Sequence, residues 1–208
     1  MLSEQFFKIL MQFPGLIFQR GYFEMKSVEI NVNDFNVNPA TLWKNQWLLL
    51  SAGEFENQNF NIMTVAWGGF GIMWDKPIAM IAVRPSRYTF EFIEKFNAFS
   101  LSAFPEKLKN KLMICGTKSG RTTDKIKESG FVPVKSKKIC APSFKEAELT
   151  IECKKLYFDD FKPMRFLSGD IEGIYNGSDY HRMYFGEIVY IKGIEKYCNF
   201  FKGGGKLC

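Results

Sequence analysis

Apolar residues along this chain fall mostly in short runs or at alternating positions, which is the pattern of β-strands. Four runs of strand length end at glycine, proline or polar turns, at residues 47–51, 62–67, 78–83 and 98–104. Residues 148–153 alternate apolar and polar side chains, and residues 183–194 form a last long strand. Few stretches between these runs have helical periodicity. The pattern therefore predicts a mainly β fold, an antiparallel barrel with peripheral helices, and disfavours a doubly wound parallel sheet.

Three helices are expected outside this barrel. Residues 38–43 have the composition of a short helix, and Phe90, Ile93 and Phe96 recur at helical spacing. A third helix is expected to begin at Pro105, since proline suits the first helical position.

The most informative stretch is 61–89, where two predicted strands are separated by a glycine cluster at residues 68–71. The cluster predicts a turn that ends the first of these strands. Because glycine has no Cβ, the backbone there can approach a flat ring closely. A turn at residues 75–77 then leads into the second strand, which Pro85 ends because it has no backbone donor.

Two arginines and two hydroxyls follow this strand, at Arg84, Ser86, Arg87 and Thr89. Ser86 is a suitable N-cap for the helix that follows. A helix start with free N–H groups, guanidinium groups and hydroxyls is what a phosphate dianion needs. The alternative is a strand-to-helix corner with solvated arginines, and the residues alone favour the two interpretations equally.

A second loop, residues 115–124, contains Gly116 and Gly120. A Walker loop needs four residues between its glycines and a lysine after the second. Here there are three residues and an arginine, which disfavours nucleotide hydrolysis. From the residues alone, a helix-to-helix turn capped by Thr123 or Asp124 is the favoured interpretation.

Composition indicates one globular domain of 208 residues in which 46% of residues are hydrophobic and 16% aromatic. The 28 basic and 22 acidic residues give a net charge of +6, which suits anionic partners such as phosphorylated cofactors. The lysines are scattered without a nucleic-acid-binding signature, so no nucleic acid partner is expected.

Cysteine usage argues against a metal site and for a reducing compartment. No C-x-x-C pair occurs, and the single His181 cannot complete a Cys/His zinc set. An odd number of cysteines without a secretory signal predicts free thiols and a cytoplasmic location, with Cys153 in the core and Cys208 exposed. The five cysteines are Cys115, Cys140, Cys153, Cys198 and Cys208.

Residues 1–25 are read as an apolar N-terminal extension, and residues 26–208 as the folded domain. Lys8 and Pro14 interrupt the apolar stretch, so no membrane span is expected. Its apolar face is expected to pack on the domain or on a partner, with an amphipathic surface anchor as the alternative. Met25 could be a second start.

Five blocks together resemble the flavoredoxin and flavin reductase-like family, whose members are FMN-binding split β-barrels. The blocks are N-I-M-T at 61–64, W-G-G at 67–69, R-P-S-R-Y-T at 84–89, C-G-T-K-S-G-R at 115–121 and Y-H-R at 180–182. They occur in the family's order, and the resemblance covers about residues 39–191, so it is more specific than any single block.

The resemblance implies FMN as the cofactor, with the isoalloxazine ring against residues 61–69. The phosphate or ribityl chain would meet the 84–89 turn and, as a second clamp, the 119–121 loop. It also implies a homodimer with the flavin site at a two-fold interface. The predicted cofactor-binding residues are Asn61, Met63, Thr64, Val65, Ala66, Trp67, Arg84, Ser86, Arg87, Tyr88, Thr89, Ser119, Gly120 and Arg121.

His181 is the predicted catalytic residue on this resemblance alone. A lone histidine before a strand is more often a surface or hydrogen-bonded residue. In the family, a histidine in this motif approaches the reactive face of the flavin.

The function implied is an FMN-dependent oxidoreductase, in which the cofactor performs the chemistry. No dinucleotide fingerprint occurs, so the electron donor is left open between NAD(P)H and a redox protein. The alternatives are a flavoredoxin-type carrier without nicotinamide turnover, and a flavin-binding module without catalysis.

Overall fold

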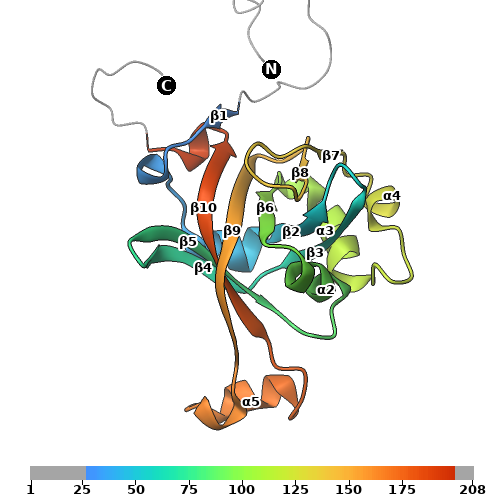
Figure 1. The fold of residues 1–208 in the computed structure, drawn as a ribbon, viewed down its shortest axis with the longest axis vertical. Helices are drawn as coiled ribbons and strands as arrows, with labels where there is room; N and C mark the ends of the chain where they lie inside the picture. Colours follow the sequence, from blue (N-terminus) through green and yellow to red (C-terminus); the bar gives the residue numbers. More distant parts are fainter. Residues whose placement is uncertain (1–26, 200–208) are drawn as a thin grey trace, which may run out of the picture.

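The computed structural model describes residues 27–199, and its centre is one antiparallel sheet of eight strands (Figure 1). Seven strands follow the order β3-β2-β6-β9-β10-β5-β4, and β1 pairs with β10 beside this path. The bounds are β1 Val28–Glu29, β2 Leu48–Glu54, β3 Asn59–Val65, β4 Gly68–Met73, β5 Lys76–Val83, β6 Ala98–Ala103, β9 Leu149–Asp160 and β10 Arg182–Gly193. A separate pair consists of β7 (Pro133–Val134) and β8 (Ser143–Phe144). The predicted antiparallel fold is confirmed.

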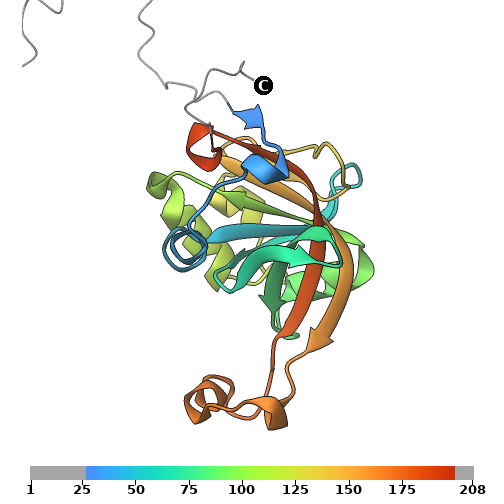
Figure 2. The same cartoon turned by 90° about the vertical axis from the view of Figure 1, so that its left-hand side faces the viewer.

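Alternate residues of β2 face two hydrophobic clusters. Leu48 and Leu50 belong to the larger cluster, whose members come from most strands of the sheet. Figure 2 shows the curl of this sheet. Leu49 instead joins a second cluster with Phe104 and Leu112, beneath α3. Because successive side chains of a strand point to opposite faces, both faces of β2 are buried. This explains why its sequence is a continuous apolar run.

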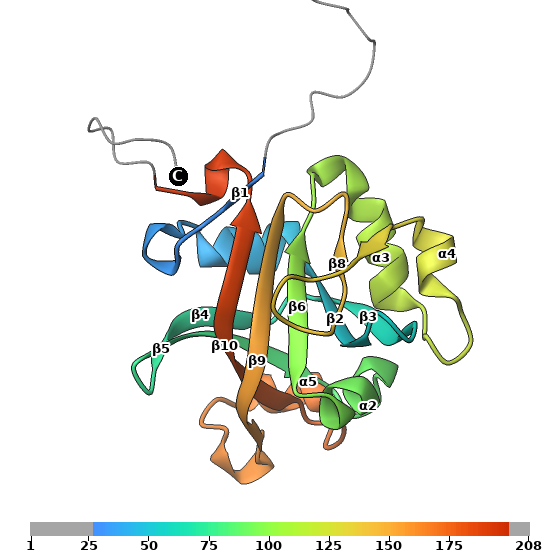
Figure 3. The ribbon, with the colours of Figure 1, turned by 45° about the horizontal axis from the view of Figure 1, so that its top comes forward.

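The helices lie outside the sheet, as expected. Figure 3 shows α2, α3 and α4 on one side of the molecule, next to β3 and β6. The helix expected at residues 38–43 is confirmed: the chain is helical from residue 39 and continues as the π-helix η2. Bounds are η1 Val32–Asp34, η2 Thr41–Gln46, α2 Tyr88–Lys95, η3 Glu106–Leu108, α3 Lys109–Thr117, α4 Lys125–Ser129, η4 Pro163–Arg165, α5 Gly169–Tyr175 and η5 Glu195–Tyr197.

The glycine cluster at residues 68–71 is part of strand β4, so the prediction that it forms a turn is wrong. β4 pairs with β5 along its whole length, and the chain reverses afterwards at Trp74, whose φ is 52°. A Cβ on Gly68 would lie 2.2 Å from the carbonyl oxygen of Met80 and 2.5 Å from the Trp43 ring. Glycine is needed here for close packing in a strand, not for a turn.

Strands β9 and β10 project beyond the body of the sheet and carry α5 at their far end (Figures 1 and 2). The alternating pattern predicted only the first part of β9. The strand continues because Tyr157 pairs with Phe185 and Phe158 with Tyr184 on β10, with ring centroids 5.7 and 6.0 Å apart. Such cross-strand aromatic pairs stabilise a two-stranded ribbon. We call residues 156–182 the arm.

Several sequence-based expectations fall on residues that the structure does not describe. The extension at residues 1–25, the alternative start at Met25 and the exposure of Cys208 all lie outside residues 27–199. The division at residue 26 stays a prediction. Cys153 is fully buried in the larger cluster, as expected.

Candidate functional site

A cavity of about 230 Å³ lies along the outer edge of β3, and we call it the edge cavity. β3 is the last strand on its side of the sheet order, so this edge has no strand partner. An unpartnered edge presents backbone N–H and C=O groups to whatever lies beside it. The cavity is lined by Met63, Thr64, Val65, Ala66, Trp67, Ala82, Arg84, Arg87 and His181.

His181 closes one side of the edge cavity against Trp67, with the two rings 4.7 Å apart. Its Nδ1 is 2.9 Å from the hydroxyl of Tyr175 in α5. Burial and then the positive charges of Arg84 and Arg87 lower the pKa of His181 to about 4, and the negative charge of Asp179 only partly offsets them. The imidazole is therefore neutral at pH 7, so it can donate or accept a hydrogen bond but carries no charge.

Ser86 does not cap the following helix, and that prediction is wrong. The N-cap of α2 is Arg87, without a side-chain capping bond. The backbone N–H of Ser86 donates to Asp179 Oδ1 at 3.0 Å, and its hydroxyl donates to Oδ2 at 2.6 Å. Arg84 lies 3.7 Å from the same carboxylate. The Asp179 carboxylate, which belongs to the arm, thus occupies the N–H and the hydroxyl of Ser86, two of the groups expected to face a phosphate.

A second cavity, of about 120 Å³, adjoins the first, because Met63 and Arg87 line both. We call it the cationic cavity. It lies between the start of α2, the end of α3 and the loop that follows. Its lining is Met63, Ser86, Arg87, Tyr88, Thr89, Cys115, Gly116, Thr117, Lys118, Ser119, Gly120 and Lys125.

Two cations of this cavity have no carboxylate partner within residues 27–199. The guanidinium group of Arg87 donates to the carbonyl of Gly116, at 3.4 Å, and the Lys125 side chain donates to backbone carbonyls. Lys118, by contrast, is ion-paired with Glu128. The cavity therefore holds two positive charges that are not neutralised by the described part of the chain.

The loop after α3 packs tightly around Gly120. A Cβ at this position would lie 2.3 Å from Asn61 Oδ1 and 2.9 Å from the Tyr88 ring. Asn61 is held in turn by a buried hydrogen bond from Nδ2 to Thr89 Oγ1, at 2.8 Å. Asp124 caps α4 by accepting from the N–H of Lys127, which confirms one of the two caps considered for this loop.

Of the predicted cofactor-binding residues, Arg121 alone lines none of three neighbouring cavities. It forms an ion pair with Glu91 and lies over the Tyr88 ring, 5.0 Å from its centroid. Asn61 lines the third cavity, of about 300 Å³, together with Tyr88 and Gly120. All the other predicted residues, including His181, line the edge cavity or the cationic cavity.

Sequence reasoning missed Lys125 and Asp179. Lys125 was one of many scattered lysines, and no local pattern separates a buried lysine from a solvated one. Asp179 ends the turn-forming sequence N-G-S-D at 176–179, and its pairing with Ser86 spans 93 residues. Only the folded position of the arm brings Asp179 to the site.

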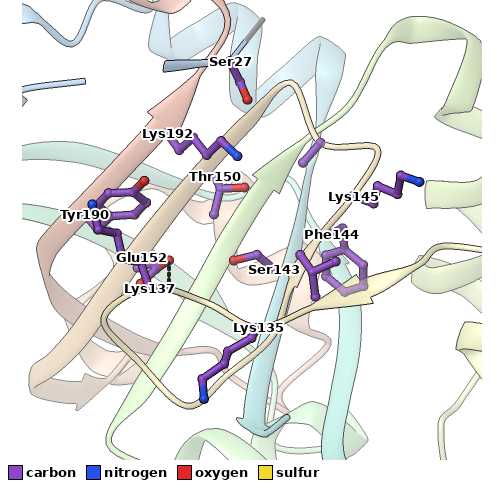
Figure 4. Close-up of a pocket in the computed structure, with 12 residues that line it drawn as sticks. Ser27, Lys135, Lys137, Ser143, Phe144, Lys145, Thr150, Glu152, Tyr190 and Lys192 are labelled. Atoms are coloured by element: carbon purple, nitrogen blue, oxygen red, sulfur yellow. Dashed lines mark hydrogen bonds between the residues drawn. The ribbon is translucent and has the colours of Figure 1, made fainter. Parts of the chain in front are cut away.

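A larger cavity of about 610 Å³ lies elsewhere, over β9 and β10 (Figure 4). Lysines surround it, but Lys137 is ion-paired with Glu29 and Lys135 with Glu56. The buried carboxylate of Glu152 accepts the backbone N–H of Lys137 at 2.8 Å. Figure 4 shows Lys135 extending away from the centre of the hollow. None of the predicted site residues lines it.

Residues 27–199 contain no cluster of three or more histidine, cysteine or acidic side chains that could hold a metal ion. Cys115, Cys140 and Cys153 are free thiols. None of the helices described is long and apolar enough to cross a membrane.

Comparison with known proteins supports a family assignment. Residues 46–196 match the model of the flavin reductase-like domain. An uncharacterized protein of Pyrococcus abyssi is 34% identical over 94 residues, which cover 45% of this chain and 53% of that protein. An uncharacterized protein of Archaeoglobus fulgidus is 29% identical over 94 residues, 45% of this chain and 52% of that protein. The chain thus spans about half the length of the curated relatives it matches.

Solved structures share the fold. The flavoredoxin of Desulfovibrio vulgaris (Miyazaki F) aligns with a TM-score of 0.57 and 22% identity, covering 74% of this chain and 73% of that one. The flavoredoxin of Methanosarcina acetivorans gives 0.58 and 24%, covering 82% and 76%. The FMN-binding domain of a flavin reductases-like enzyme from Shewanella baltica OS155 gives 0.61 and 15%, covering 86% and 82%. These similarities confirm the split-barrel fold class.

Proposed function

Because the chain belongs to the flavin reductase-like domain family, we propose that it is an FMN-binding oxidoreductase that passes electrons from NAD(P)H or a redox partner through the bound flavin. The observation that carries the proposal is the pair of adjoining cavities. One lies along an unpartnered strand edge and has aromatic walls, and the other holds two cations without carboxylate partners in the described part of the chain. FMN consists of a flat ring and a phosphate joined by a short chain, so its two ends match the two cavities.

The residues present fit the cofactor. A phosphate dianion would neutralise Arg87 and Lys125, and the hydroxyls of Thr89 and Ser119 line the same cavity. The ring would lie in the edge cavity between Trp67 and the outer edge of β3. Tight packing around Gly120 holds the loop close to the cationic cavity.

The bound flavin supplies the redox chemistry, by accepting and releasing electrons. The chain's own residues bind and orient it. Backbone groups on the free edge of β3 can hydrogen-bond to the ring. We propose that neutral His181, held by Tyr175, contacts the ring as a hydrogen-bond partner, because at pH 7 the side chain is not the imidazolium that would serve as an acid.

The electron donor separates the proposal from two alternatives. A reductase accepts hydride from NADH or NADPH, whereas a flavoredoxin-type carrier is reduced by a protein. Two of the similar structures are flavoredoxins, which favours keeping the carrier as the second candidate. A flavin-binding module without turnover is the third.

The expected result is that the purified protein binds FMN in a 1:1 ratio and turns yellow, and that NADH or NADPH then bleaches the flavin at a catalytic rate under anaerobic conditions. Reduction only by a reduced protein partner would instead identify a carrier, and no reduction by either would leave a binding module. A protein that stays colourless in excess FMN, with no change in FMN fluorescence or thermal midpoint, would contradict the proposal itself.

We further propose a homodimer, because a broad apolar surface is exposed on the arm and on the β4–β5 turn. In the arm, Leu167 is fully exposed and Met164 is 90% exposed, and Ile72 in β4 is 73% exposed. The rings of Trp74, in the β4–β5 turn, and Tyr157, in the arm, have their centroids 6.0 Å apart, so the two segments are in contact. Large exposed apolar side chains on both segments support the proposal of an interface with a second copy of the chain.

Light scattering is expected to give about 48 kDa, twice the chain mass of 24.1 kDa. Leu167→Glu should shift the protein toward the monomer, because an ionised carboxylate is costly to bury at an interface. Met113→Glu is the matched control, since Met113 is half exposed on α3 and outside this surface. A wild-type mass equal to that of one chain, or equal effects of the two variants, would contradict the proposed interface.

We also propose a cytoplasmic location. The free thiols described above are those expected in a reducing compartment. Measurement of free thiols in protein taken directly from cells tests this.

A further inference from the structure

We propose that Asp179 is a positioning residue: together with Arg84 it attaches the end of the arm to the β5–α2 turn, and so holds the His181 ring as one wall of the edge cavity. We call this set of contacts the clasp. Asp179 lines neither the edge cavity nor the cationic cavity, so it would act through His181 and not on a ligand directly. The inference deepens the proposed function and rests on it only for the identity of the ring that His181 faces.

The Asp179 carboxylate makes the first half of the clasp. One oxygen accepts the N–H of Ser86 at 3.0 Å, and the other accepts its hydroxyl at 2.6 Å. Asp179 has a φ of 54°, in a turn where Asn176 and Gly177 also have positive φ. Aspartate adopts this left-handed conformation more readily than most residues, so the turn directs the carboxylate back to the body of the protein. Two bonds to one carboxylate fix its orientation as well as its distance.

Arg84 makes the second half of the clasp. Its guanidinium group lies 3.7 Å from the Asp179 carboxylate, donates to the carbonyl of Ile174 at 3.3 Å, and lies over the Tyr175 ring, 5.1 Å from its centroid. Ile174 is in the last turn of α5, where carbonyls lack a partner within the helix and a cation is favourable. All three contacts reach the end of the arm, so Arg84 joins the end of β5 to it.

The clasp reaches His181 through Tyr175. The Tyr175 hydroxyl is 2.9 Å from His181 Nδ1, and Tyr175 is only 3% exposed. Its ring stacks on those of Phe166 and Tyr180, with centroids 5.6 and 4.7 Å apart. The end of the arm is therefore held together by its own contacts, and the clasp adds the attachment of this unit to the β5–α2 turn.

Strand pairing fixes the backbone next to His181 but not its ring. Arg182, the following residue, pairs with Val83 at the end of β5. An imidazole can still rotate about its side-chain bonds unless a partner holds it. In the described part of the chain, the bond with Tyr175 is the one hydrogen bond of the His181 ring, whose other close neighbour is the Trp67 ring at 4.7 Å. The clasp is therefore what keeps this ring facing the cavity.

The test uses NMR of protein labelled at histidine and free of a histidine tag, which reports His181 alone because the chain has one histidine. In the flavin-free wild type, the Trp67 ring should shift the imidazole signals, because the two rings are 4.7 Å apart. Tyr175→Phe removes only the hydroxyl and shows the signal of a ring without its hydrogen bond. Asp179→Ala should reproduce that signal and lose most of the shift caused by Trp67.

Asp179→Asn separates geometry from charge. An amide can accept the Ser86 N–H and donate to its hydroxyl, so both hydrogen bonds remain while the negative charge is lost. In Asp179→Ala the pKa of His181 should rise from about 4 toward its ordinary value of about 6.5, because the released imidazole regains water. In Asp179→Asn it should not rise, since losing a negative charge disfavours the imidazolium. Arg84 and Arg87, the cations that face His181, are present in both variants.

Asp170→Ala is the matched control, because this carboxylate of the arm accepts the hydroxyl of Ser168 within the arm. It should leave the signal and the pKa of His181 unchanged. Wild-type signals in Asp179→Ala, or equal changes in Asp179→Ala and Asp170→Ala, would overturn the proposal. If Asp179→Ala does not fold, Ser86→Ala removes one of the two hydrogen bonds and should move the His181 signal part of the way. No movement in that variant would then refute the clasp.

Adding FMN separates this inference from the proposed function. In a wild type that binds FMN, the His181 signal should move on binding, as it should in Asp179→Asn, and should move much less in Asp179→Ala. The same movement in all three proteins would overturn the positioning role. A wild type that binds no flavin would contradict the proposed function, while the flavin-free signals would still decide whether Asp179 holds His181.

Discussion

Arg87→Ala is expected to weaken FMN binding by about ten- to a hundredfold and to leave riboflavin binding almost unchanged. A hydrogen bond to a charged group contributes about 1.5 to 3 kcal/mol, which corresponds to this range of affinity. Arg87 lines both the cationic and the edge cavity, and its guanidinium group donates to the carbonyl of Gly116 at 3.4 Å. Its guanidinium group can therefore bind a phosphate without first breaking an ion pair within the described part of the chain.

Arg121→Ala provides the matched control. Arg121 lies close by in the fold but outside the cavities, and its charge is already neutralised by Glu91. Removing it should change FMN affinity by less than about threefold, because an exposed ion pair contributes little. Titrating both variants with FMN and riboflavin gives a difference from which general damage to the fold cancels. Equal losses for the two ligands in Arg87→Ala would show that Arg87 is structural, and would move the phosphate contact to Arg84 or the 119–121 loop.

Arg87 and Lys125 are distinguished by pH. Arg87 keeps its charge throughout the accessible range, so its contribution to FMN binding should be constant. The contribution of Lys125 to FMN binding should fall as the pH rises above about 8, because protonating the lysine then costs free energy that binding must supply. The two cations are thus expected to affect binding differently at pH 9 although they line the same cavity.

Local pattern was enough to predict most of the barrel because strands such as β2, β5, β6 and β9 bury at least one face against the interior, whereas β4, which has no buried residue, was not predicted. The alternation of β9 and the long last strand β10 follow directly from this. The arm was missed because its residues bury little, and cross-strand pairs such as Tyr157 with Phe185 hold it instead. Such pairs join residues far apart in the chain, so no single stretch reveals them.

The site was predictable where motifs bring donors together locally, and not where the arm contributes. Ser86 illustrates the limit. Its position before a helix is close to that of an N-cap, but α2 has Arg87 as its N-cap, and the Ser86 hydroxyl donates to the Asp179 carboxylate without accepting a helix N–H. Because Asp179 belongs to the arm and Ser86 to the β5–α2 turn, the contact depends on tertiary structure. Local capping preference is overridden in such cases.

The glycine cluster at residues 68–71 shows how one composition fits two structures. Glycines permit both a turn with positive φ and a strand that other groups approach closely. In β4 the second use applies, because Gly68 faces the carbonyl oxygen of Met80 on the paired strand and the ring of Trp43. A Cβ on Gly71, in the same strand, would meet no atom of the described chain within 4 Å. Gly68 therefore permits a close packing contact that a side chain would block, whereas Gly71 does not.

Gly68→Ala is expected to lower the free energy of unfolding by about 3 kcal/mol, whereas Gly71→Ala should change it by less than about 1 kcal/mol. At Gly68 the added methyl group would lie 2.2 Å from a backbone oxygen that cannot move without separating β4 from β5. Urea unfolding of both variants without flavin measures the difference free of ligand stabilisation. If the two substitutions proved equally mild, the close approach of β4 to Met80 and Trp43 would not be required for stability. In that case the glycines would have to be explained by contact with the cofactor, as the sequence pattern predicts.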